Sequence, residues 1–599
     1  MSNLEGPSHS LTRPGRDIRL RWKEDMIPQE SLLHQPITYV GPSGDLDPML
    51  LAHRSYKDRI SSVSKYTKAT YYRMRPLQQN GGSLLPPAVF TLIEDIPGRQ
   101  TDLSESSEQL RDELRSRFEE KIDSITASGL LALYLRYVHP VFPIISRHQL
   151  PAEEDCVLDI PLGLLAAICA TALPFVLYDD ALCVESFRLP TQDELFELSW
   201  NALVEESSSP SIPTLQGYLL QLHRHYDAKV QSCDALKWSL CCQTISMAQV
   251  LGLNEDPSFW ITLPGWERHL RKRLWWACWV TEKWIAFGQG MPSHVHQRDF
   301  TVDPLTQQDL VDYESKDWEP TSYFVHLVRL TGILDDIMES FFTIRATARM
   351  MENVQESLQA ARVFRQRLKE WHQNLPPELN DDSVKEGRSN GILDRSPNEL
   401  NGNASLRIAF FATQLAIFRA LIRPVSMYFL YGKRHPGTFP EHAAASITKE
   451  FISATMQGAV SRLRDFIGFV ERLTTADWDA FWPGWSRHNF ALASTLLMHC
   501  HLLASSPELG WIPLNPSEIH SVSSPEDITL NNSVLEMDGT NVPTMTPSTQ
   551  SEVGILGRKW RWILRLVARG AAGKKNLTDI SLHRIDALFT EWSQAQISQ

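Results

Sequence analysis

Cysteine is scarce in this 599-residue chain, and its pattern excludes several kinds of protein. The eight cysteines are widely scattered, and no Cys-x-x-Cys pair occurs. Structural zinc sites use closely spaced ligand pairs, so the sequence predicts no metal site of that kind. Because most of these cysteines lie in apolar stretches, we expect buried, reduced thiols rather than a disulfide framework.

The chain also has no excess of positive charge. Its formal net charge is −13, which excludes binding of nucleic acid by bulk electrostatics and would leave such a role to a local basic patch. A loose basic cluster lies between Arg13 and Lys23, in a region rich in turn-forming residues. The first residues contain no apolar run of the kind that a secretory signal carries, so we expect no secretion signal there.

Strand signals are scarce as well, and the long apolar runs follow the period of a helix. Leu110, Leu114, Phe118 and Ile122 repeat every four residues, as on one face of a helix. The chain has 18 tryptophans, a number that favours large helix-on-helix cores. The sequence therefore predicts an all-α fold, with one large helical domain into which disordered loops are inserted.

Composition divides the chain into four parts. Two polar stretches, about 375–405 and 506–552, are rich in Ser, Pro, Asn and Gly and read as a disordered loop and a disordered linker. We therefore predict a mostly irregular N-terminal region over 1–103, a helical domain over 104–505 that contains the loop, the linker over 506–552, and a C-terminal helical segment over 553–599.

One apolar run approaches the length that spans a bilayer. Residues 160–178 carry no charge, but Pro161 and Pro174 interrupt the run and no Lys or Arg flanks it. We predict a buried core helix that ends near Pro174, and no contact with a membrane.

The sequence contains only incomplete versions of known catalytic and cofactor-binding motifs. Gly288 and Gly290 begin a dinucleotide fingerprint, but the third glycine and the preceding strand are missing. His499, Cys500 and His501 are consecutive, and neighbours on a helix point about 100° apart, so they cannot converge on one ion. The sequence predicts no catalytic residue, no metal site and no cofactor in this chain.

One acidic motif keeps an enzyme open as the alternative. Asp335, Asp336 and Glu339 form a DDxxE pattern, whose oxygen ligands suit Mg²⁺ on a helix. An all-helical, magnesium-dependent enzyme acting on an isoprenoid diphosphate would also need a second acidic motif. The nearest candidate, residues 380–386, has the wrong spacing and lies in the polar stretch, so a solvated acidic face is the competing interpretation.

A basic stripe marks the C-terminal segment. Its four arginines are spaced three, four and four residues apart and therefore share one face of a helix. Such a face could contact acidic partners or phosphates, or could simply be the solvated side of a packed helix. The four residues are Arg558, Arg561, Arg565 and Arg569.

Four segments, in order, resemble one known family. Residues 135–145 (LRYVHPVFPII) resemble the opening signature of the fungal-specific transcription factor domain, the middle homology region of the zinc binuclear cluster regulators. Similar matches follow at 213–222, at 238–254, and at 271–276 (RKRLWW). A fifth, at 288–300, contains the break after a helix. The motif core covers about 130–310.

The resemblance implies a regulatory, effector-sensing domain of a nuclear regulator of RNA polymerase II transcription, and no enzyme. The residues that carry the motifs read mainly as determinants of the fold. They are His139, Pro140, Phe142, Pro143, Trp238, Leu251, Gly252, Arg271, Arg273, Trp275, Trp276, Gly290, Pro292 and Asp299.

The chain departs from the family at one point. Members usually begin with six cysteines that hold two zinc ions, whereas here no cysteine precedes Cys156. Zinc is therefore expected only if such a cluster lies upstream of these residues, and sequence-specific DNA binding by this chain alone is not expected. The implied partners are other transcription regulators or a DNA-binding protein, and a small-molecule effector and a homodimer stay open.

Overall fold

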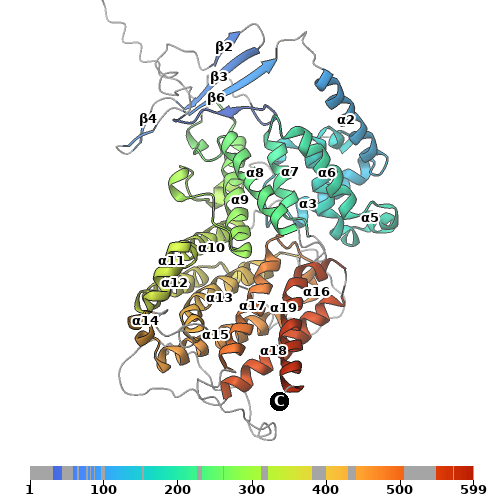
Figure 1. Ribbon diagram of the computed structural model, residues 1–599. Coiled ribbons are helices and arrows are strands. Elements are labelled where there is room, and N and C mark those ends of the chain that lie inside the picture. The colour runs from blue at the N-terminus through green and yellow to red at the C-terminus, as the bar shows by residue number, and fades with distance from the viewer. Residues whose placement is uncertain are drawn as a thin grey trace, which may run out of the picture.

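Helices make up nearly all of the described structure. The computed structural model describes residues 31–43, 59–63, 67–75, 78–80, 83–85, 88–95, 102–151, 154–225, 233–260, 262–311, 322–380, 400–429, 440–504, 548–570 and 572–597. Within residues 102–597, the described part contains 18 α-helices and no strand, which confirms the predicted all-α fold. Figure 1 shows the helices in two groups, one beneath an N-terminal sheet and one towards the opposite end.

The N-terminal sheet lies in the region that the sequence pattern predicted to be mostly irregular. Four antiparallel strands pair in the order β1-β6-β3-β2, and β4 and β5 form a separate hairpin. The strands are β1 (Thr38–Tyr39), β2 (Arg59–Val63), β3 (Thr67–Arg75), β4 (Gln78–Asn80), β5 (Ser83–Leu85) and β6 (Ala88–Asp95). The prediction missed them because most are short and separated by turn-forming residues.

Tertiary contacts explain how this sheet is held. Phe90 of β6 is fully buried and meets Trp260 edge-on at 5.3 Å between ring centroids. Tyr39 of β1 packs on the other side of Phe90 at 5.6 Å. The sheet therefore depends on an indole supplied from far along the chain, which no local pattern could reveal.

The first helical group surrounds α4, in which every residue is buried. A 3-10 turn continues from Leu173 to Tyr178 with Pro174 near its start, so the uncharged run found in the sequence is a core helix, as its interruption by proline predicted. The group comprises α2 (Asp102–Glu119), α3 (Ser124–Tyr137), α4 (Leu162–Ala172), α5 (Asp180–Glu185), α6 (Gln192–Glu206), α7 (Ile212–Leu222), α8 (Cys233–Val250) and α9 (Gly265–Gln289).

The second helical group is built on α13. This helix alone among the described residues is long and apolar enough to cross a membrane, but 89% of that window is buried inside the protein, as expected of a core helix. The group comprises α10 (Tyr323–Ile337), α11 (Ile344–Glu352), α12 (Val354–Gln373), α13 (Asn403–Met427), α14 (Glu441–Ser446), α15 (Lys449–Glu471), α16 (Thr475–Asp479), α17 (Ser486–Ala504), α18 (Ser548–Ala568) and α19 (Ala572–Ile597).

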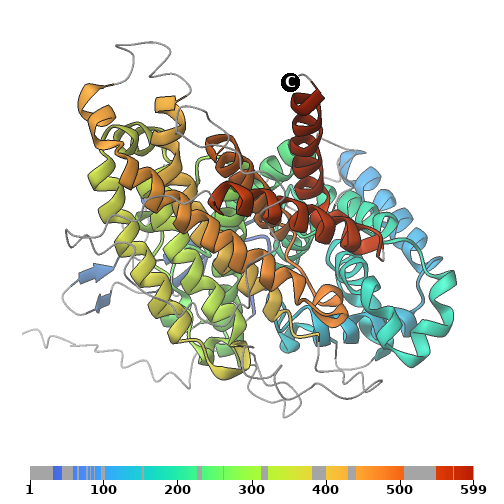
Figure 2. The ribbon, with the colours of Figure 1, turned by 90° about the horizontal axis from the view of Figure 1, so that it is seen from below.

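The C-terminal helices complete this second group. Trp560 of α18 is fully buried and meets Phe466 of α15 at 5.4 Å between ring centroids. Ser581 of α19 lies 2.8 Å from Ser494 of α17 between hydroxyl oxygens, and Figure 2 shows the red C-terminal helices against the orange ones. Residues 381–399 and 505–547, most of the two predicted disordered stretches, lie outside the described residues.

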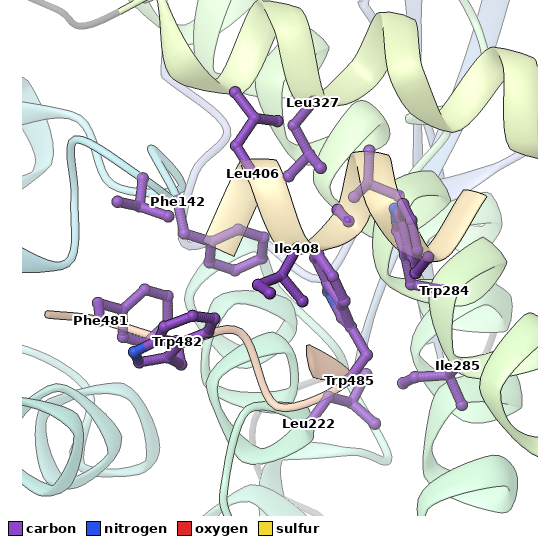
Figure 3. Packing of buried hydrophobic residues seen from close by; sticks show 14 of the residues in the cluster. Phe142, Leu222, Trp284, Ile285, Leu327, Leu406, Ile408, Phe481, Trp482 and Trp485 are labelled. Atoms are coloured by element: carbon purple, nitrogen blue, oxygen red, sulfur yellow. The ribbon is translucent and has the colours of Figure 1, made fainter. Parts of the chain in front are cut away.

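The two groups share one hydrophobic core. Trp284 of α9 stacks on Trp485, just before α17, with ring centroids 4.6 Å apart and planes 16° apart. Figure 3 shows that Ile408 of α13, Phe142 and Leu222 converge on the same place. Residues from both groups therefore belong to one continuous cluster of buried side chains.

Candidate functional site

The helix α9 carries the strongest of the sequence motifs and an unusual number of buried charges. Glu267, Arg271, Arg273, Glu282 and Lys283 are each at most 1% exposed. The helix starts after Pro264 and ends at Gly290, whose φ of +73° is the left-handed conformation that glycine adopts readily. Charges so deeply buried are costly unless each finds a partner.

Arg271 finds its partner one turn away. Its guanidinium lies 2.9 Å from the Glu267 carboxylate and donates a hydrogen bond to the Leu251 carbonyl. The same carboxylate accepts hydrogen bonds from the Ser31 hydroxyl and the Leu32 amide. The pair therefore ties the N-terminal segment and the end of α8 to α9.

Lys272 and Arg273 connect α9 to the segment that contains Asp309 and Leu310. The Lys272 ammonium lies 3.1 Å from the Asp309 carboxylate, and the Arg273 guanidinium faces the carbonyls of Asp309, Leu310 and Ile145 at 3.3–3.5 Å. Burial alone would raise the pKa of Asp309, but hydrogen bonds from His269 and Thr306 and the charge of Lys272 hold that pKa below its usual value.

The DDxxE motif does not form a metal site. Asp335 is buried and lies 2.6 Å from the Lys283 ammonium, whereas Asp336 is 2.6 Å from the Arg367 guanidinium. Glu339 points to His296 instead, at 3.9 Å. Because the three carboxylates face three different partners, they do not converge on one Mg²⁺ ion. The alternative of an enzyme acting on an isoprenoid diphosphate therefore has no support. Asp335 is also no solvated surface residue.

The paired tryptophans of the motif are core residues. Trp275 is fully buried, and Trp276 is 7% exposed and donates a hydrogen bond from its indole to the Asp303 carbonyl at 3.0 Å. Both indoles pack on Phe300, with ring centroids 5.3 and 5.7 Å away. They hold the segment after α9 in place.

The first motif forms a buried turn at the end of α3. His139, Phe142 and Pro143 are buried and Pro140 is half-buried. Phe142 meets His223 edge-on, with ring centroids 4.4 Å apart. The signature residues therefore pack against the end of α7 and form no solvent-exposed site.

The motif around α8 serves packing against the sheet. Leu251 is fully buried, and Gly252 has a φ of +66°. A Cβ at position 252 would lie 2.4 Å from Cζ of Phe90, so glycine is needed both for the turn and for the contact. Trp238 is half-buried and packs on His294 at 4.6 Å between ring centroids.

The remaining motif residues end α9 and shape the following loop. Gly290 is the C-cap of the helix, and Pro292 is exposed. The exposed Asp299 carboxylate accepts a hydrogen bond from the His296 amide at 3.2 Å. Asp299 thus caps a short turn.

The basic stripe of α18 is half neutralised. Arg561 and Arg565 both pair with Asp586 of α19, at 2.6 and 2.9 Å. Arg558 and Arg569 are exposed and have no ion pair within the described residues. The stripe therefore offers solvent fewer free charges than its four arginines suggest.

Sequence reasoning missed a cluster of neutral histidines between the two helical groups. Burial, followed by the charge of Lys237, lowers the pKa of His223 and of His488 to about 3 and that of His225 to about 4. The signal available in the sequence was the pair of histidines at positions 223 and 225, at the end of an apolar run.

Taken together, the motif residues build a scaffold and no reaction centre. No group of three or more His, Cys, Asp or Glu side chains able to hold a metal occurs in the described part of the chain. The buried charges of α9 are used to fasten loops, strands and helices to one another. The role of these buried charges is therefore structural.

Comparison with known proteins agrees with these motifs. Residues 131–373 match the sequence model of the fungal specific transcription factor domain. Over these residues, which make up less than half of its length, the chain is similar to that domain. The match begins within α3, ends with α12 and contains all of α9, so the buried charges of α9 lie inside the matched region.

Relatives among curated proteins are fungal regulators. The chain is 25% identical to an uncharacterized transcriptional regulatory protein of Schizosaccharomyces pombe, over 80% of this chain and 64% of that protein. It is 24% identical to the transcriptional activator protein DAL81 of Saccharomyces cerevisiae, over 64% of this chain and 40% of that one. The chain thus spans less than two thirds of the length of either. No solved structure matches it significantly.

Proposed function

We propose that the chain is a nuclear regulator of RNA polymerase II transcription in a fungus, acting through its fungal specific transcription factor domain. The match of residues 131–373 to that domain carries the proposal. Two further observations support it: relatives are described as transcriptional regulators, and the motif-bearing helix α9 is a scaffold with no arrangement of catalytic groups.

The regulator reaches promoters through a partner that reads DNA, or through a zinc cluster encoded upstream of these residues. Affinity for duplex DNA comes largely from neutralising phosphates with Lys and Arg, whereas this chain has a net charge of −13. The exposed arginines of α18 supply too few contacts for specific binding.

A tethering experiment tests the function. The 599-residue chain is fused to an unrelated DNA-binding domain, and the output of a reporter with the matching site is measured in yeast. We expect output to change severalfold relative to the DNA-binding domain alone. Arg345→Gln, a change at an exposed side chain of α11, serves as the matched control and should leave the change intact. A folded, nuclear fusion without any effect on the reporter would refute the proposal.

Two biochemical predictions accompany it. Selection from random duplexes at physiological salt should enrich no motif for the purified chain alone. Elemental analysis should find no stoichiometric zinc, because the sequence contains no Cys-x-x-Cys pair. A tightly bound motif, or one zinc ion per chain, would contradict the respective prediction.

A further inference from the structure

Two arginines on the core helix α13 stand one turn apart. Arg419 and Arg423 are separated by four residues and therefore lie on the same face of the helix. Both are half-buried. α13 packs against α17, whose half-buried His499 is the third member of the group that we call the α13 cationic cluster: Arg419, Arg423 and His499.

The described residues supply no counter-charge to the two arginines of this cluster. Within the described residues, no carboxylate lies within 4 Å of either guanidinium, and neither makes a hydrogen bond. Arg423 instead lies over the ring of Phe342, with 4.6 Å between its guanidinium carbon and the ring centroid. The Nδ1 atom of His499 is buried and has no hydrogen-bond partner.

Among the described residues, the neighbouring charges that act on the cluster are positive. Burial, then the charge of Arg584, lowers the pKa of Arg419. Burial, then Arg419, lowers the pKa of Arg423 to about 10, and burial followed by both arginines lowers the pKa of His499. Arg584 is held nearby on α19, where it donates hydrogen bonds to the Ala491 carbonyl and the Thr495 hydroxyl of α17.

Such an arrangement is costly without an anion. Half-buried guanidinium groups lose part of their hydration, and like charges nearby add repulsion, so a folded chain normally supplies a carboxylate at such a place. A guanidinium also presents a planar fork of donors that fits the oxygens of a carboxylate or phosphate group. The orphaned imidazole nitrogen adds a further polar group that an incoming ligand would satisfy.

We propose that the α13 cationic cluster is a binding site for a small anion that carries carboxylate or phosphate oxygens. The ligand lies between α13 and α17, where the two guanidinium groups bind its acidic oxygens and His499 supplies a further hydrogen bond. The ring of Phe342 packs against the Arg423 guanidinium and forms an apolar side of the site. A small molecule fits better than the backbone of a nucleic acid, because both guanidinium groups are recessed among helices.

The charged groups of the site lie outside the matched region. Residues 131–373 match the family model and include Phe342, whereas Arg419, Arg423 and His499 all lie beyond it. The proposal therefore does not depend on the proposed function, and a binding experiment on the purified chain addresses it without any reporter.

Thermal unfolding of the full chain tests the proposal. Pyrophosphate and citrate serve as separate probes, so that phosphate and carboxylate chemistry are distinguished, and sodium chloride at equal ionic strength controls for screening. For the wild type and for Arg345→Gln we expect a saturable rise in Tm of about 2 °C or more with at least one probe. The Arg419→Gln/Arg423→Gln variant should show no such rise.

The proposal also predicts how the double variant compares with the wild type when no ligand is present. Because the described residues supply no carboxylate to the two arginines, their substitution should leave the Tm of the ligand-free protein unchanged or raise it. A loss of Tm on substitution would assign the arginines a structural role and overturn the proposal. So would equal stabilisation of wild type and variant by the probes, or the absence of any rise above the chloride control.

A second measurement needs no variant. Phenylglyoxal modifies accessible arginines, and mass spectrometry reports the extent at each position in the wild-type chain. We expect the better probe to slow modification of Arg419 and Arg423 severalfold and to leave Arg345 unchanged. Equal rates at Arg419 and Arg423 with and without the probe would refute the site, and protection of these two by a DNA duplex but by neither probe would assign it to nucleic acid instead.

Discussion

Along α9, the buried cations Arg271, Lys272 and Lys283 each have a carboxylate partner at 2.6–3.1 Å. Along α13, Arg419 and Arg423 have none among the described residues. Both helices contribute to one continuous hydrophobic core, so burial alone does not explain the difference. In the first region ion pairs fasten elements to one another, whereas in the second the described residues supply no carboxylate, and we propose that an external anion does so. Four predictions sharpen this contrast, and a fifth measurement tests it directly.

The largest effect is expected from acid at the histidines between the two regions. His223, His225 and His488 stay neutral in the folded protein, because burial and Lys237 lower each pKa from 6.5 to about 3 or 4. Below pH 6.5 the unfolded chain therefore binds more protons, and stability is lost as the pH falls from 6.5 towards 4. The loss is at most about 4 kcal/mol per pH unit with all three titrating.

Urea denaturation at several pH values between 7 and 5 measures this slope. The His488→Gln variant removes one of these titrating groups, so its slope should be shallower by up to about 1.4 kcal/mol per pH unit. A wild-type stability that does not change between pH 6.5 and 5, or a variant with the unchanged slope, would show that the cluster is not held neutral by the fold.

Truncation of the scaffold comes next in size. Trp275→Ala removes a fully buried indole and should cost about 3–5 kcal/mol, and Trp276→Ala should cost a similar amount. We expect loss of folded protein, measured by denaturation and by soluble yield, rather than a selective loss of signalling. Variants that melt like the wild type while reporter output changes would instead place these tryptophans at a ligand or partner surface.

A smaller effect is expected where α8 meets the sheet. Gly252→Ala places a Cβ 2.4 Å from Phe90 Cζ at a residue whose φ is +66°, so it should cost about 1–3 kcal/mol. The matched control is Gly332→Ala in α10, where a Cβ would meet nothing within 4 Å. That change should be neutral or stabilising by about 0.5–1 kcal/mol. Equal effects of the two changes would contradict the contact.

The smallest effect is expected at the surface of α18. Asp586→Asn releases Arg561 and Arg565 from a half-exposed pair and should change stability by less than about 1 kcal/mol. The same change should raise weak, salt-dependent binding to any DNA duplex, because two more arginines become free. A titration at low and at physiological salt measures this, and binding that stays unchanged would mean that Asp586 does not restrain the stripe.

Sequence patterns predicted those parts of the molecule that depend on local periodicity. The repeat from Leu114 to Phe118 and Ile122 is buried as expected, and α2 begins at Asp102, close to the predicted start. Leu110, from the same repeat, is 37% exposed, so the repeat is buried only over its later members. The family motifs likewise identified α9 and its C-terminal end.

The missed features depend on partners that are distant in sequence. Lys283 and Asp335 are 52 residues apart, and their pairing turned an apparent magnesium motif into a structural contact. The strand β6 depends on Trp260, whose side chain arrives from beyond α8. The absence of a partner is harder still to predict: the fold is needed to show that no carboxylate of the described residues reaches Arg419 or Arg423.

The most direct test compares one substitution in each region by urea denaturation at pH 7. Lys283→Met leaves the buried Asp335 carboxylate without its partner and should lower the free energy of unfolding by about 3–5 kcal/mol. Arg423→Gln removes a charge that has no carboxylate partner among the described residues and should leave the free energy of unfolding unchanged or raise it. If Arg423→Gln lowers the free energy of unfolding as much as Lys283→Met does, the α13 cationic cluster is part of the scaffold, and the contrast between the two regions is wrong.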